Sequence, residues 1–289
     1  MTRRSFVDLP DGWVREEARG FGPFVTAETL RRPDGLVVRW ESRRYRKQQR
    51  GDAGSTWWAP GAVGWWIGLL FAVGSACFAL GALPSYAHAV GARSDNLTFF
   101  VGSLFFTAAA FLLYLEVATT GLGPDAGAGR RWRALWRVSP ARIDWWASLV
   151  QLVGTLFFNL STGHALVGTF TDPTGANHAV WRPDAFGSVC FLVSSWLSWA
   201  EVSDGWWSWR PGRISWWIAG LNLAGSIAFG VSAVASKVQS DGSLRNLGLT
   251  NLGTFVGALC FLAGSVLLFP ERTGGDGEPA PATAPAASA

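Results

Sequence analysis

Six long apolar segments constrain this chain more than any other feature of its sequence. They cover residues 64–83, 97–117, 145–167, 186–202, 214–235 and 247–269. Most of them reach the roughly 20 residues that a helix needs to cross about 30 Å of hydrocarbon. Lipid offers no hydrogen-bond partner to backbone N–H and C=O groups, so uninterrupted apolar segments of this length form helices. The sequence therefore predicts an all-α membrane protein with six transmembrane helices.

A sequence motif of fixed spacing occurs three times along these segments. It reads P-x4-W-W-x7-G-[ST]-x2-F, and a second motif, G-[SA]-x2-F-x9-E, follows each copy. The copies predict three tandem helical-hairpin repeats over residues 57–118, 132–203 and 206–272. Because each repeat has two spans, all three hairpins point the same way through the membrane. A pseudo-threefold arrangement about an axis along the membrane normal is one packing that this allows, and an open row of hairpins is another.

The residues of the two motifs are typical of membrane anchoring and helix packing. An indole ring combines a polar edge with a large apolar face, which suits the membrane interface. Small residues let neighbouring helices approach closely where lipid supplies no hydrophobic force between them. The interface candidates are Trp65, Trp66, Trp145, Trp146, Trp216 and Trp217, and the packing candidates are Gly74, Ser75, Gly102, Gly154, Gly187, Gly225 and Gly257. A ligand-stacking cage of tryptophans and a path lined by the hydroxyls are the alternatives.

Each copy of the second motif ends in an acid, which is Glu116, Glu201 or Glu271. These glutamates fall at the C-terminal ends of their helices, where the macrodipole disfavours an acid, so we expect a compensating group nearby. Arg142 and Arg213, each four residues before the second tryptophan of its repeat, are the predicted partners, together with indole N–H groups. The alternative is a substrate or proton role for the glutamates.

Basic residues lie mainly on one predicted side of the membrane. Of the 24 Lys and Arg, only Arg93, Arg182, Lys237 and Arg245 fall on the other side. Because basic loops stay in the cytoplasm, the sequence predicts a multi-pass protein of a bacterial inner membrane with both termini cytoplasmic.

Residues 1–56 form a basic N-terminal segment. Two short runs flank Pro33-Asp34-Gly35 and predict a β-hairpin over residues 26–42, which needs a partner or the membrane surface to be stable. The basic run from Arg43 to Arg50 predicts a topology determinant that contacts anionic lipid headgroups. A protein partner of this segment is a further prediction, and no nucleic acid is expected because no binding motif is present. The tail, residues 273–289, is predicted to be disordered.

Reactive side chains are scarce in the predicted spans. The middle of the membrane contains no Asp, Glu, Lys, Arg or His, which argues against a proton-coupled carrier and a charged intramembrane hydrolase. Gln151 and Asn222 share one repeat position and are predicted to hydrogen-bond between helices. We expect no catalytic residue, cofactor or metal. Whether the cysteines or the histidines converge in space is left open: Cys77, Cys190, Cys260, His88, His164 and His178.

The first hairpin resembles the YrhK-like domain, a two-helix membrane domain whose spans each contain a Gly-Ser step followed by aromatics. The residues that carry the resemblance are V-G-S-A-C-F at 73–78 and F-V-G-S-L-F-F at 100–106. The segment W-E-S-R-R at 40–44 is similar to uncharacterised multi-span proteins of high-GC bacteria. In the later hairpins Thr155 and Ala258 replace Ser. The resemblance implies an integral membrane protein of unknown activity and supplies no catalytic residues.

These features predict a non-enzymatic membrane protein that acts as a structural, sensory or partner-binding module. The alternative is a channel or carrier for a small solute along an axis between the repeats. Repeat glycines buried in helix contacts would support the module, whereas a polar cavity at mid-depth would support transport.

Overall fold

Six membrane helices make up most of the protein. The computed structural model describes residues 12–48, 55–120, 127–170 and 172–273. The predicted tail beyond residue 273 and Arg50 lie outside these ranges. All six helices are long and apolar enough to cross a membrane, so the chain is a multi-pass membrane protein, as predicted. They are α2 (Val63–Gly81), α4 (Ala92–Ala118), α6 (Ile143–Val167), α8 (Arg182–Ser203), α9 (Ile214–Ala235) and α10 (Leu247–Thr273).

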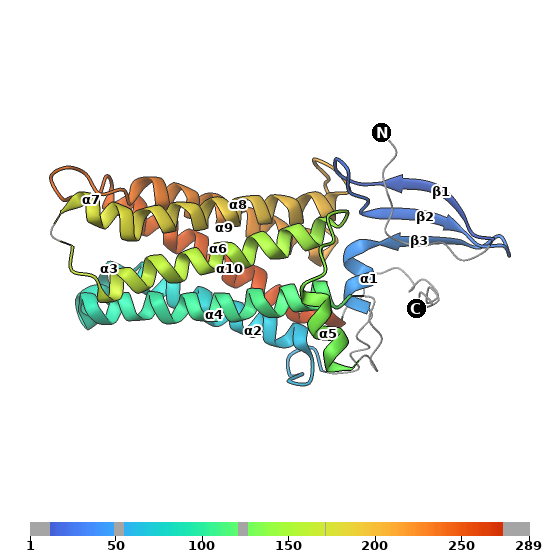
Figure 1. The fold of residues 1–289 in the computed structure, drawn as a ribbon, viewed down its shortest axis with the longest axis horizontal. Helices are drawn as coiled ribbons and strands as arrows, with labels where there is room; N and C mark the ends of the chain where they lie inside the picture. Colours follow the sequence, from blue (N-terminus) through green and yellow to red (C-terminus); the bar gives the residue numbers. More distant parts are fainter. Residues whose placement is uncertain (1–11, 49–54, 121–126, 171, 274–289) are drawn as a thin grey trace.

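The six helices close into a ring. Each helix packs against the next of the six in chain order, and α10 packs against α2. Their axes run side by side along the length of the molecule (Figure 1). The observed arrangement is therefore closed, and the open row of hairpins that the sequence also allowed is not formed.

Phenylalanines from all three hairpins fill the centre of this ring. One comes from each of the three copies of both motifs. The centroids of neighbouring rings lie 5.1–6.3 Å apart, mostly edge to face, which is an arrangement that aromatic rings favour. All six are buried. They are Phe78, Phe106, Phe158, Phe191, Phe229 and Phe261.

Within each hairpin, two glycines lie opposite each other. A Cβ atom built on Gly74 would lie 3.0 Å from the carbonyl oxygen of Gly102, and one built on Gly102 would lie 2.8 Å from Cβ of Cys77. The pairs Gly154 with Gly187 and Gly225 with Gly257 make the same kind of contact. Close backbone approach provides the van der Waals contact that holds helices together in lipid.

The outer surface of the ring is apolar. Exposed side chains on the helices include Leu104, Leu156, Val189, Val234 and Leu259, whereas small hydroxyls lie inside. Ser75 donates to the carbonyl of Phe71 at 2.7 Å, and Thr155 donates to that of Leu152 at 2.7 Å. Backbone carbonyls thus satisfy these buried hydroxyls, and the apolar residues are left to face lipid.

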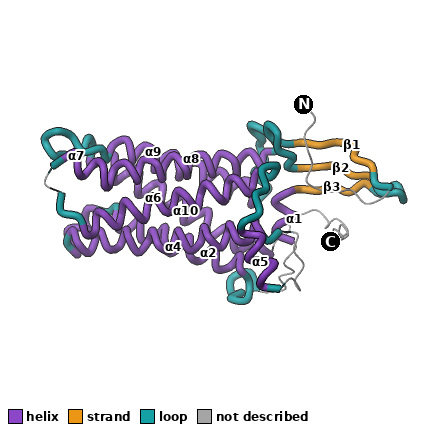
Figure 2. Tube along the Cα trace, in the orientation of Figure 1, coloured by secondary structure: helices purple, strands orange, loops and turns teal. Residues whose placement is uncertain are grey.

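A small domain stands at one end of the ring. Strands β1 (Val14–Arg19), β2 (Ala27–Arg31) and β3 (Val37–Glu41) form an antiparallel sheet in that order, and helix α1 (Ser42–Gln48) follows. Strands β2 and β3 lie where the hairpin was predicted, with Gly35 in its turn at φ +82°, whereas β1 was not predicted. The sheet projects away from the helices and α1 lies between the two (Figures 1 and 2). We call this the sheet end of the ring.

Short elements complete the two ends. Helix α5 (Ala128–Leu135) lies near the sheet end, and α3 (Pro84–Val90) and α7 (Pro173–Ala176) lie at the far end (Figure 1). The π-helical turn η1 (Asn177–Trp181) joins α7 to α8. The fourth apolar helical segment, Pro173–Ser203, therefore begins well before the predicted start at residue 186.

Replacing one glycine of a facing pair tests the packing. We expect Gly225→Ala to lower the free energy of unfolding by about 1–3 kcal/mol, because overpacking a tight contact has a cost of that size. The added Cβ would meet Gly257 O at 3.0 Å and Phe261 at 3.1 Å. Gly230→Ala in the same helix is the matched control, since nothing lies within 4 Å of its Cβ position. Equal unfolding free energies for the two variants in a denaturant titration would contradict the packing role.

Candidate functional site beneath helix α1

The paired tryptophans lie at the sheet end of the ring. In every repeat the second tryptophan donates its indole Nε1–H to the carbonyl of the proline six residues earlier, which explains why the spacing between them is fixed. The first tryptophan of each pair is buried at 6–7% exposure. Interface anchoring stays a prediction that this position favours. The three bonds are Trp66 to Pro60 at 2.9 Å, Trp146 to Pro140 at 3.2 Å and Trp217 to Pro211 at 2.9 Å.

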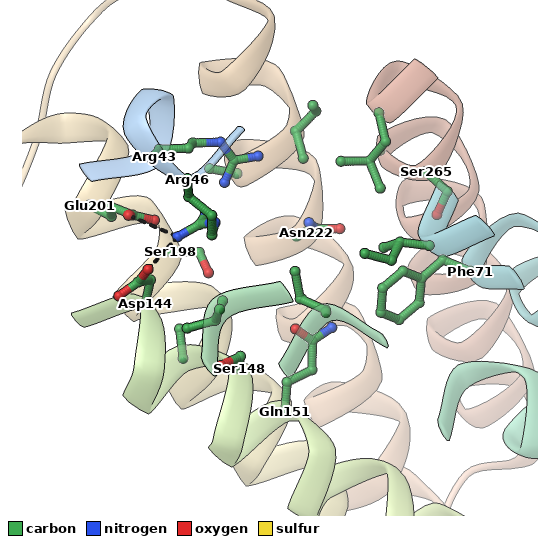
Figure 3. Close-up of a pocket in the computed structure, with 18 of the residues that line it drawn as sticks. Arg43, Arg46, Phe71, Asp144, Ser148, Gln151, Ser198, Glu201, Asn222 and Ser265 are labelled. Atoms are coloured by element: carbon green, nitrogen blue, oxygen red, sulfur yellow. Dashed lines mark hydrogen bonds and ion pairs between the residues drawn. The ribbon is translucent and has the colours of Figure 1, made fainter. Parts of the chain in front are cut away.

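Helix α1 places Arg46 in the middle of the sheet end. Its Nη1 lies 2.7 Å from Oδ2 of Asp144, at the start of α6, and 3.4 Å from Oε1 of Glu201, near the end of α8. The side chains of all three residues are only 3–4% exposed, and Figure 3 shows the guanidinium between the two carboxylates. A buried charge of this kind is tolerated only when it is paired.

Other residues of α1 also contact acids at the sheet end of the helix ring. Arg43 Nε lies 2.7 Å from Glu271 Oε1, and Lys47 Nζ lies 3.4 Å from Glu271 Oε2. Ser42 donates its hydroxyl to Glu201 Oε1 at 2.9 Å. Residues 43, 46 and 47 share one face of a helix, so a single turn of α1 neutralises acids from two hairpins.

The electrostatic field at α1 comes from all three hairpins. Burial alone would lower the pKa of Arg46, but the negative charges of Glu201, Asp144 and Glu116 raise it above the ordinary arginine value. For Arg43, burial also acts to lower the pKa and the carboxylate of Glu271 raises it. Both arginines therefore stay charged, and the three repeat glutamates lie close enough to α1 to act on it.

The predicted partners of the repeat glutamates were wrong. Arg142 pairs with Asp144 at 2.6 Å and donates to the carbonyl of Val117 at 3.0 Å, and Arg213 pairs with Glu41 of β3. Helix α1 supplies the cations for Glu201 and Glu271 instead. Arg43, Arg46 and Lys47 face these carboxylates. Their position therefore does not support the predicted contact of the basic run with anionic lipid headgroups, which stays a prediction.

Further contacts fix the sheet to the loop between α8 and α9. Thr26 donates its hydroxyl to Asp204 Oδ1 at 2.9 Å, and Arg39 lies 3.6 Å from Asp204 Oδ2. The ring of Phe21 packs edge-on against Trp206, with centroids 4.8 Å apart. The N-terminal domain is thus attached to the ring at two places, through α1 and through β2 and β3.

A cavity of about 80 Å³ with a mixed polar and apolar lining lies below α1. Arg43, Arg46 and Lys47 line its mouth, while Phe261, which also packs into the aromatic core, lines it deeper. Between these levels the lining includes two carboxamides and three serine hydroxyls, from Gln151, Asn222, Ser148, Ser198 and Ser265 (Figure 3).

The other sequence candidates do not come together. Within the described ranges, no group of three or more His, Cys, Asp or Glu could hold a metal ion. Cys77, Cys190 and Cys260 each sit against a glycine of their own hairpin. Nδ1 of His164 lies 2.8 Å from the carbonyl oxygen of Ala179, which gives this histidine a local structural contact.

Asp144 and the inward face of α1 were missed by sequence reasoning. An acid directly before a tryptophan pair occurs only in the second repeat, and its position at a helix N-terminus is favourable. The spacing of Arg43, Arg46 and Lys47 at i, i+3 and i+4 was a second available signal, because such residues share a helix face. A short helix with basic residues on one face, together with acids at the ends of later helices, predicts that these basic residues and acids form ion pairs.

Removing Arg46 tests the ion-pair cluster. We expect Arg46→Ala to lower the free energy of unfolding by about 3–5 kcal/mol, because it leaves the buried Glu201 without a cation and Asp144 with Arg142 alone. Arg31→Ala is the control, since Arg31 pairs with Glu16 at 52% side-chain exposure and exposed pairs contribute about 1 kcal/mol or less. Similar losses for both variants, measured by denaturant unfolding in detergent, would show that the buried cluster adds no particular stability.

Comparison with known proteins gives no match: no family model, curated protein or solved structure matches this chain. The resemblance of the first hairpin to the YrhK-like domain stays a prediction.

Proposed function

We propose that this protein is a non-enzymatic membrane module whose N-terminal domain binds a partner in the cytoplasm and passes the state of that contact to the helix ring. The observation that carries the proposal is the buried position of Arg46 between Asp144 and Glu201. The positive-inside distribution of basic residues supports a cytoplasmic position for this domain.

The geometry of α1 is suited to such coupling. Helix α1 follows β3 without a linker, so a displacement of the sheet moves α1 as well. Its cations contact acids of α6, α8 and α10, so movement of α1 changes the electrostatic balance at three helix ends. A domain held only by exposed contacts could bind a partner without affecting the ring.

A small-solute channel or carrier is the second candidate. The cavity beneath α1 favours it, because its place between the repeats is where a path would begin. The six central phenylalanines weigh against it, since their rings touch across the centre of the ring and leave the cavity with an aromatic floor. The module is the better-supported reading.

Site-specific crosslinking in cells tests the partner. We expect a photo-crosslinking residue at Val14, which is 58% exposed on the edge strand β1, to give a discrete protein adduct. The same residue at Val167, 77% exposed at the far end of α6, should give no such adduct and is the matched control. If the two positions give the same adducts, or if Val14 gives none, the partner-binding role is wrong.

A flux measurement separates the module from the carrier. In proteoliposomes made with the full chain, we expect labelled amino acids, sugars and nucleosides to enter no faster than in protein-free liposomes, because the phenylalanine core closes the centre of the ring. Saturable uptake of one of these solutes would replace the module with the carrier.

A further inference from the structure

The cavity beneath α1 lies where corresponding positions of the three repeats meet. Phe71, Gln151 and Asn222 each follow the second tryptophan of their repeat by five residues, and all three line the cavity. Leu113, Ser198 and Leu268 each precede their repeat's glutamate by three residues and line it too. Two repeats thus present polar groups at the first of these positions, and the remaining repeat presents an aromatic ring.

The two carboxamides lack protein partners. Neither the Gln151 nor the Asn222 side chain hydrogen-bonds to any residue in the part of the chain that the structure describes, so the predicted interhelical bonds are not formed. Both side chains are half-buried, so their hydrogen-bonding groups are open to a small molecule or water inside the cavity.

We propose that this cavity binds a small neutral molecule that carries an adjacent hydrogen-bond donor and acceptor, such as a primary amide or a urea, with α1 as its lid. A carboxamide offers N–H donors next to a C=O acceptor, so its best complement is a group with the same pair.

Charge and size support a neutral ligand of this class. The cations at the mouth already face the carboxylates of Asp144, Glu201 and Glu271, so an added ion would disturb a balanced cluster. A water molecule needs about 10–15 Å³ of such space, so the 80 Å³ present suits a molecule of a few non-hydrogen atoms. Phe71 and Phe261 offer apolar contact to its remaining surface.

Helix α1 controls access to this site. Arg43, Arg46 and Lys47 lie at its mouth while their charges are held by the ring. A shift of α1 that widens this mouth would break the Arg46 ion pairs. The inference does not depend on a protein partner, since the carboxamides face the cavity whatever the sheet binds.

Ligand binding is tested on the full chain in lipid nanodiscs, with acetamide and methylurea as probes. We expect a saturable rise in Tm with each probe and at least a tenfold weaker response in the double variant Gln151→Leu, Asn222→Leu. This variant should fold, because the first repeat carries Phe71 at the same position. Acetate, the charged isostere of acetamide, should give no saturable response. Equal responses of the native protein and the double variant, or none from either, would mean that the cavity holds water only, and the proposal would be overturned.

A single-residue variant provides an independent check. A Cβ on Gly264 would lie 3.1 Å from Oδ1 of Asn222, so we expect Gly264→Ala to weaken the acetamide response several-fold. Gly230→Ala, whose Cβ has open space, should leave the response unchanged. If Gly264→Ala folds and responds like the native protein, Asn222 does not contact the probe and the site is wrong.

Discussion

A guanidinium that leaves water must find carboxylates, and in this protein Arg46 finds them at the ends of two membrane helices. Asp144 and Glu201 lie 2.7 and 3.4 Å from its Nη1, and removing either side of such a buried pair is costly. This requirement fixes α1 against the ring, and the sheet follows because β3 runs directly into α1. The position of α1 over the cavity and the pairing of Glu201 both depend on it.

The ring itself is held by a different kind of force. Inside lipid the helices gain nothing by hiding apolar surface from one another, so contact must come from close approach. Facing glycines provide that approach within each hairpin, since a Cβ on Gly74 would lie only 3.0 Å from the carbonyl oxygen of Gly102, and six phenylalanines fill the centre between hairpins. Short-range packing therefore holds the spans, whereas charge holds the domain above them.

The sequence was informative where one constraint acts alone. Segment length and the hydrogen-bonding needs of the backbone were enough to predict six helices, and Pro33-Asp34-Gly35 was enough to locate the β2–β3 turn. It was misleading where two partners compete. Arg142 was expected to pair with a repeat glutamate, but Asp144, two residues away, holds it at 2.6 Å, and cations of α1 pair with Glu201 and Glu271 instead. Such choices depend on which groups the fold brings together, and the pattern of a single segment does not contain that information.

The attachment of α1 has a consequence for how the chain is made. Arg43 and Glu271, which lie 2.7 Å apart, are separated by 228 residues. At roughly 5–20 residues per second, the ribosome needs about 10–50 s to make the second after the first. During that interval Arg43 and Lys47 lack the carboxylate with which they pair in the finished fold. The contact between α1 and α10 can therefore form only after all six spans have been made.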